Sequence, residues 1–129
     1  MSSVIIRYPV EELTGDLAGS PERDRLRLVF EFVGRWREAD DLQCAGLIAG
    51  PPLPTNSRQW DSLVAGLVEH LAAQRAIPTP AWVDEPHRFV DGAWWVIDTP
   101  LFRVWALHDT PAALLRHGVM LSRADLERV

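Results

Sequence analysis

The chain has 129 residues, a length that suits one domain with its own core, so we expect a single helical domain over residues 1–129. Its composition, 47% hydrophobic and 24% charged, is that of a globular protein and excludes a disordered or fibrous chain. The formal net charge of −5 argues against non-specific binding to nucleic acid, and the single cysteine excludes an intrachain disulfide framework and a multi-cysteine zinc site.

Two helices are predicted at the start of the chain. Pro9 suits the first position of a helix, and the apolar residues after it recur at helical spacing until about Gly19. Ser20 and Pro21 give a hydroxyl cap and a first-position proline to a second helix. The apolar stripe of this second helix is broad enough for a central helix with more than one neighbour; it comprises Leu26, Leu28, Val29, Phe30, Phe32, Val33 and Trp36.

The next two helices are predicted from different signals. Asp40-Asp41 can start a short third helix, which the run Gly50–Pro54 stops because proline cannot continue a helix. After Asn56-Ser57 the apolar residues match the helical template at every step. Gly66 lies within this fourth helix, where glycine costs about 1 kcal/mol relative to alanine, so we expect a neighbouring helix to approach closely there.

The segment from Ala81 to Asp98 is irregular. Its apolar residues fit no helical period, and Asp91-Gly92 signals a turn. The segment is therefore either a packed loop with one helical turn or a small hairpin, and we favour the loop.

Short elements complete the chain. Thr99-Pro100 and Thr110-Pro111 each combine a cap with a first-position proline and predict two further helices, the second of which ends at Gly118. A short extended link then leads to a last helical turn that begins at Ser122 and includes Val129. The predicted fold class is all-α, a compact bundle of about six or seven short helices with an irregular Trp-rich segment.

The Trp-rich segment is the most informative part of the chain for function. Tryptophan and arginine dominate binding hot spots at protein interfaces, but such rings can equally close a core over a helical bundle. Adjacent Trp94 and Trp95 point in different directions in a strand or a helix, so one of them can be exposed. The candidate partner-binding residues are Trp82, Arg88, Trp94 and Trp95.

A catalytic function has little support from motifs. No Gly-rich phosphate loop, G-x-S-x-G elbow or H-E-x-x-H is present, so no catalytic residue, metal site or cofactor is predicted. Cys44 has no local positive setting and is expected to be a small buried hydrophobe. The alternative hypothesis is an enzyme of unrecognised class that uses Asp84, Glu85, His87 and Asp91.

A nucleic-acid-binding regulator is a second alternative, because arginines are dense in the second predicted helix. Carboxylates interleave with them and outnumber them, which favours a solvated face of ion pairs. These arginines are Arg23, Arg25, Arg27, Arg35 and Arg37.

We expect a cytoplasmic protein without a membrane partner. Residues 1–7 do not resemble a signal peptide, because no long apolar stretch follows a charged region. The uncharged stretch between Leu42 and Arg58 is interrupted by prolines and cannot span a bilayer.

Several stretches together resemble a known domain: Trp60–Leu71, Ile77–Trp82, Arg88–Asp91, Trp94-Trp95, Thr110–Ala113 and Asp125–Val129. They are similar to an uncharacterised actinobacterial domain that occurs alone or behind an Xre-type helix-turn-helix, often in toxin–antitoxin-like gene contexts. The resemblance covers roughly the last 70 residues strongly and the first 55 weakly. We know of no assigned catalytic residues in that domain to carry over, and we expect no Xre-like module here, so DNA binding does not carry over either.

Together, the charge, the Trp-rich segment and this resemblance predict a small acidic helical protein–protein interaction module. Its expected role is that of an antitoxin-like or regulatory partner of another protein, such as a toxin encoded nearby. A homo-oligomer is left open.

Overall fold

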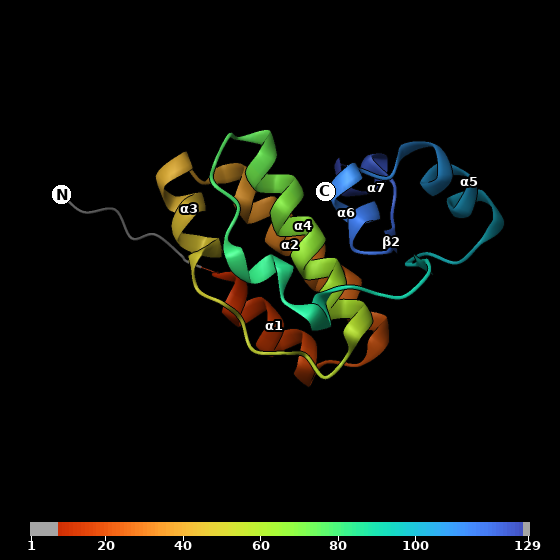
Figure 1. Ribbon diagram of the computed structural model, residues 1–129, viewed down its shortest axis with the longest axis horizontal. Helices are drawn as coiled ribbons and strands as arrows, with labels where there is room; N and C mark the ends of the chain where they lie inside the picture. The colour runs from red at the N-terminus through yellow and green to blue at the C-terminus, as the bar shows by residue number, and fades with distance from the viewer. Residues whose placement is uncertain (1–7, 128–129) are drawn as a thin grey trace.

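The computed structural model describes residues 8–127. Within them seven α-helices pack together, and the only strands are two of two residues each (Figure 1). This is the all-α bundle that the sequence predicts, although Val129 lies outside the described residues. No helix in this part of the chain is long and apolar enough to cross a membrane. The helices are α1 (Val10–Gly19), α2 (Glu22–Glu38), α3 (Asp41–Ala49), α4 (Arg58–Gln74), α5 (Pro100–Asp109), α6 (Ala112–Arg116) and α7 (Arg123–Glu127).

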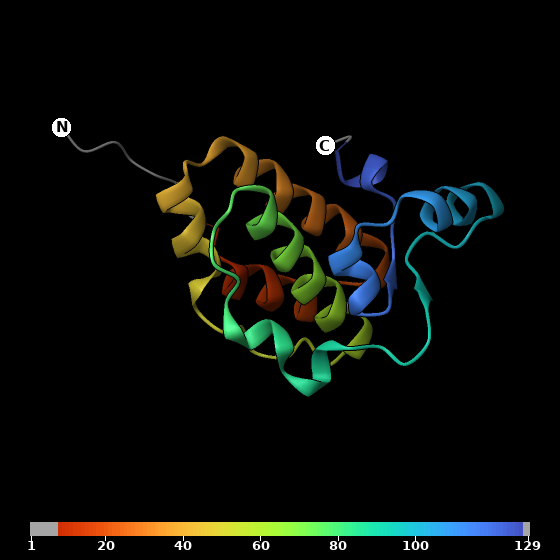
Figure 2. The same ribbon diagram turned by 45° about the horizontal axis from the view of Figure 1, so that its top comes forward.

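The central helix of the bundle is α4. Its residues from Trp60 to Ala72 are buried, apart from the half-buried Glu69. It packs against α1, against α6 and against two 3-10 turns, η1 (Ala81–Asp84) and η2 (Pro86–Arg88) (Figure 2). The second helix has more than one neighbour, as its broad stripe predicts, because α2 contacts α1 and is bonded to residues at the end of α4 and in α7. The most buried helix is nevertheless α4: α2 buries Val29, Phe32, Val33 and Trp36 and leaves Leu26, Leu28 and Phe30 half-buried.

Side chains complete the hydrogen bonding at several helix ends. Asp40 and Gln43 form a capping box at the start of α3, where each side chain accepts a hydrogen bond from the other residue's backbone N–H. Arg75, just after α4, donates to the carbonyl oxygens of Trp36 and Ala39 at 3.0 and 2.6 Å. These bonds satisfy carbonyl groups that the end of α2 leaves unpaired, and they join α2 to α4.

The close approach expected at Gly66 is present. A Cβ at this position would lie 2.9 Å from Leu114 Cδ2 and 3.1 Å from Leu114 Cα. Leu114 belongs to α6 and is fully buried. The helix stability that Gly66 costs α4 is thus offset by close packing against α6.

The segment from Ala81 to Asp98 is a loop, as favoured above, but it contains two 3-10 turns, η1 and η2, where one helical turn was predicted. The part between η2 and α5 also contributes to a small sheet. Two of its residues form β1 (Trp94–Trp95), which pairs in parallel with β2 (Val119–Met120). Val90 N–H also donates to the His117 carbonyl at 3.0 Å, and Trp94 N–H to the Gly118 carbonyl at 2.8 Å. We call residues 89–97 the strap, because these backbone bonds hold them against the end of α6.

Candidate protein-interaction surface

Two of the four candidate partner-binding residues lie inside the fold. Trp82 is buried, and its indole N–H donates to the Ile48 carbonyl at 2.9 Å. Arg88 is fully buried with its guanidinium 4.7 Å from the centre of the Trp82 ring, and it donates to Glu85 Oε1 and to the Pro52 carbonyl, both at 2.9 Å. For these two residues the core interpretation holds, and their expected place on a contact surface is corrected because neither offers surface to a partner.

The other two candidates are half-buried and face different neighbours. The Trp94 ring meets the Trp60 ring edge-on, with 5.1 Å between the ring centres. The Trp95 ring instead lies under the guanidinium of Arg103 at 4.5 Å. Trp94 therefore joins the core at the start of α4, whereas Trp95 lies beside α5.

The most conspicuous apolar surface is on α5 itself, which projects from the rest of the bundle (Figures 1 and 2). Four of the seven exposed large apolar side chains among residues 8–127 lie on this helix, and Ala106 is its only buried residue. We call these four residues the α5 face: Leu101 (56% exposed), Val104 (49%), Trp105 (40%) and Leu107 (66%).

Charged groups flank the α5 face but do not interrupt it. With about 100° of rotation per residue, Leu101, Val104 and Trp105 share one side of the helix with the exposed His108, and Ala106 lies on the opposite side. Arg103, on one flank, donates to Asp98 at 2.5 Å and holds the pKa of that carboxyl below its ordinary value. Asp109, on the other flank, lies 3.9 Å from Arg123.

A cluster of polar side chains ties α4 to α6. His117 is fully buried, and its ring lies 2.6 Å from the Arg88 carbonyl through Nδ1 and 3.1 Å from Glu69 Oε1 through Nε2. Arg116 bonds both Glu69 and Asp84. Burial pushes the pKa of Glu69 upward, but the bonds from Arg116 and His117 outweigh burial and hold that pKa below its ordinary value. These contacts lock elements together and leave His117 no access to a substrate.

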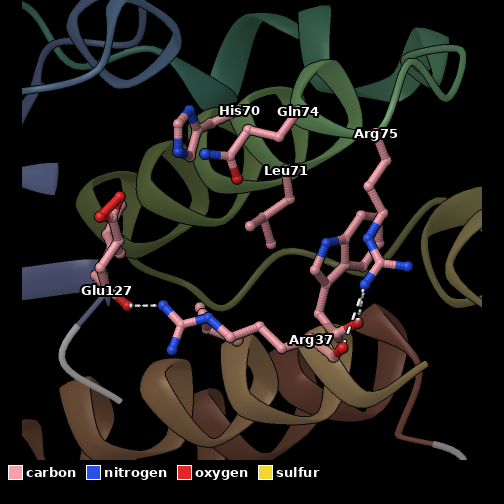
Figure 3. Close-up of a pocket in the computed structure, with 9 residues that line it drawn as sticks. Arg37, His70, Leu71, Gln74, Arg75 and Glu127 are labelled. Carbon is pink, nitrogen blue, oxygen red and sulfur yellow. Dashed lines mark hydrogen bonds between the residues drawn. The ribbon is translucent and has the colours of Figure 1, made fainter. Parts of the chain in front are cut away.

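A pocket of about 290 Å³ lies between α2, α4 and α7, and two of its polar side chains, Arg37 and Arg75, bond the backbone of neighbouring elements (Figure 3). Arg37 reaches across it to donate to the Leu126 carbonyl at 2.7 Å, and Arg75 points to the end of α2. His70 also lines the pocket. The pocket thus lies where arginine side chains join the helices to one another.

His70 gives a prediction for the pH dependence of stability. Burial lowers the pKa of His70, and the positive charge of Arg123 lowers it further while Glu127 acts in the opposite direction. The unfolded chain, with a histidine pKa of about 6.5, therefore takes up a proton more readily than the folded chain does. We expect the free energy of unfolding to be unaffected by this residue above about pH 7 and to fall as the pH drops from about 6.5 to 5.

Urea denaturation at a series of pH values measures this effect. His70→Gln should flatten the slope between about pH 6.5 and 5. A slope that His70→Gln does not alter would contradict the assignment.

The residues of the alternative enzyme hypothesis are engaged separately. Asp84 bonds Arg116, Glu85 bonds Arg88, and Asp91 is exposed at the turn of the strap. His87 has a buried Nε2 with no hydrogen-bond partner among the residues described. Across residues 8–127 no group of three His, Cys, Asp or Glu side chains could hold a metal ion. These contacts provide no convergent acid–base set.

Cys44 is buried, as expected from its apolar neighbours. Its Sγ lies 3.4 Å from the Trp36 carbonyl, and burial raises the pKa of the thiol. A thiol with a raised pKa is a poor nucleophile near neutral pH, so Cys44 acts as a small core residue.

Several arginines of α2 make local contacts. Arg27 pairs with Glu31 at 2.9 Å and Arg25 with Glu22 at 3.2 Å, which confirms ion pairing along this helix. Arg35 stacks on the Tyr8 ring at 4.8 Å. These three arginines thus contact carboxylates or an aromatic ring of the same chain.

The α5 face is the feature that the sequence interpretation missed. The apolar residues of the helix were visible in the sequence, but they were used only to predict a helix and not to predict which side of it is exposed. The available signal was their distribution, because Leu101, Phe102, Val104, Trp105 and Leu107 surround the helix and cannot all face one neighbour.

Comparison of the chain with protein-family models, with curated proteins and with solved structures found no match. The functional interpretation therefore depends on the geometry of its own side chains.

Proposed function

We propose that this chain is a protein–protein interaction module, an antitoxin-like or regulatory partner of another protein, and that the α5 face is its contact surface. The observation that carries the proposal is α5, a helix with four large exposed apolar side chains and one buried residue. A group of apolar side chains exposed together marks an interaction site, because covering it removes water at about 25 cal/mol per Å².

The charge distribution supports a protein as the ligand of this face. The chain carries a net charge of −5; among residues 100–109 the basic side chains are His108, on the exposed side of α5, and Arg103, which is paired with Asp98 at its flank. Binding to nucleic acid or to an anionic membrane surface relies on basic side chains next to the contact, so neither fits the α5 face. Trp95, half-buried beside Arg103, extends the contact from α5 toward the strap. The cytoplasmic location remains a prediction from the sequence.

Purification of the tagged protein from its native host, with mass spectrometry of what co-elutes, tests this proposal. We expect one protein at stoichiometric level with the wild-type chain and its loss with the double variant Leu101→Glu, Val104→Glu. Glutamate is a good helix former, so α5 should stay folded, which circular dichroism can verify.

The matched control is Leu42→Glu in the first turn of α3, where the leucine is 85% exposed and outside the α5 face. This variant should retain the co-eluting protein. The proposal fails if no protein co-elutes, or if the double variant keeps the same protein at the same level.

A further inference from the structure

We propose that the α5 face binds a second copy of this chain, with the two α5 helices antiparallel about a two-fold axis. The inference rests on the proposed function, because it takes the α5 face as a protein contact. In the dimer both α5 faces are covered, so another protein binds this face only by displacing the second copy.

The order of residues along α5 suits this arrangement. Val104 and Trp105 lie near the middle of the exposed side, with Leu101 one turn before them and His108 one turn after. In an antiparallel pair the central residues of the two copies meet at the axis, and Leu101 lies opposite His108 of the second copy. The spacing i, i+3, i+4 and i+7 is the spacing with which one helix covers the apolar stripe of another.

Charge favours the α5 face as the place where two acidic copies meet. Each copy carries a net charge of −5, so the copies repel each other over most orientations. The α5 face has no carboxylate, and the charges beside it have partners within their own chain, Asp98 with Arg103 and Asp109 with Arg123. Two copies can therefore join through α5 without placing like charges in contact.

The available area predicts a dimer that depends on protein concentration. At the exposures given above, the four side chains present roughly 400 Å² of apolar surface in each copy, within the range of functional patches on monomers. Two such faces give roughly 800 Å², which is below the roughly 1,200–2,000 Å² of stable specific interfaces and in the range of weak, transient contacts. Because α5 projects from the bundle, the two copies can approach through this helix alone (Figures 1 and 2).

Sedimentation equilibrium over a range of protein concentrations tests the inference. The mass should rise from 14.5 kDa toward twice that value as concentration increases. Val104→Glu should raise the dimer Kd by about 100-fold or more, because it buries an unpaired carboxylate from each copy against the other. Leu42→Glu should leave Kd unchanged, since this leucine lies outside the α5 face.

A mixing experiment identifies the second copy as the occupant. Val104→Glu and Val104→Lys should each be monomeric alone and should pair when mixed, because residue 104 meets its own counterpart across a two-fold axis. Added salt should strengthen the wild-type dimer, since it screens the repulsion between two acidic copies.

The outcomes separate this inference from the proposed function. A monomer at all concentrations, a dimer insensitive to Val104→Glu, or mixed variants that do not pair would overturn the inference. A monomer that still captures a host protein through the α5 face would overturn it and leave the proposed function standing. A dimer formed through α5 that captures no other protein would support the inference and overturn the regulatory role.

Discussion

Replacing Gly118 with alanine is expected to lower the free energy of unfolding by about 3 kcal/mol or more. Gly118 has a φ of +80°, a left-handed conformation that costs a residue with a Cβ roughly 1–2 kcal/mol. The new Cβ would also lie 2.5 Å from the Val90 carbonyl oxygen and 3.0 Å from the Gly92 carbonyl oxygen. Both contacts are with backbone atoms, so the strap would have to move away from α6.

Gly92→Ala is the matched control, because it shares the conformation without the contact. Gly92 has a φ of +78°, and a Cβ there would meet no atom within 4 Å. We expect a loss of only about 1–2 kcal/mol, from the backbone conformation alone. Urea denaturation followed by circular dichroism measures both variants. Equal losses would show that the approach of the strap to Gly118 contributes nothing to stability.

Replacing Arg88 with alanine is expected to cost about 3–5 kcal/mol of stability. The substitution removes the guanidinium that stacks on Trp82, leaves the Pro52 carbonyl without its donor, and opens a cavity where a fully buried side chain stood. Arg58→Ala is a suitable comparison, because Arg58 is exposed and its side chain donates to the Pro86 carbonyl at 3.1 Å. That variant should lose less than about 1 kcal/mol.

Arg88→Met separates the effect of the cavity from the effect of the lost hydrogen bonds. Methionine fills much of the arginine's volume but donates to no carbonyl, so its loss of stability should lie between those of wild type and Arg88→Ala. Thermal denaturation of the three proteins checks this order. A stability of Arg88→Ala within about 1 kcal/mol of wild type would contradict the structural role of this arginine.

Helix starts could be predicted from the sequence because their signals are local. The Ser57 hydroxyl accepts from Trp60 N–H, and Ser122 Oγ accepts from Asp125 N–H at 3.2 Å, each within three residues of the capping group. The capping box of Asp40 and Gln43 is equally local. Such contacts depend only on neighbours in the chain. Local signals were not always sufficient, because three predicted hydroxyl caps do not form: Pro21 rather than Ser20 precedes α2, Thr99 makes no capping hydrogen bond, and Thr110 Oγ1 donates to the Ala106 carbonyl.

The positions of Trp82 and Arg88 could not be predicted in this way. Their polar atoms bond carbonyl groups of Ile48 and Pro52, more than thirty residues earlier in the chain. Tryptophan and arginine are frequent at interfaces and also serve in cores when their N–H groups find such partners. Residue type therefore left the two interpretations open, and only the tertiary arrangement decides between them.

Which helix is the most buried could not be predicted from the sequence either. Both α2 and α4 carry broad apolar patterns, and periodicity does not state how many neighbours a helix receives. Gly66 was the informative residue, because a glycine inside a strong helix indicates a close neighbour. The exposed side of α5 escaped prediction for the related reason that an apolar helix looks the same in sequence whether its neighbour belongs to the same chain or to another one.

The burial of α4 on all sides has a consequence for how the chain folds. One side of α4 is covered by α1, and other sides are covered by η1, η2, α6 and β2, which come later in the chain. A fragment that ends with α4 would leave apolar side chains of this helix in water. A fragment of the later elements alone would contain no helix as long as α4 to pack against. Folding should therefore be cooperative, and amide hydrogens in the middle of α4 should exchange with solvent only when the whole molecule opens.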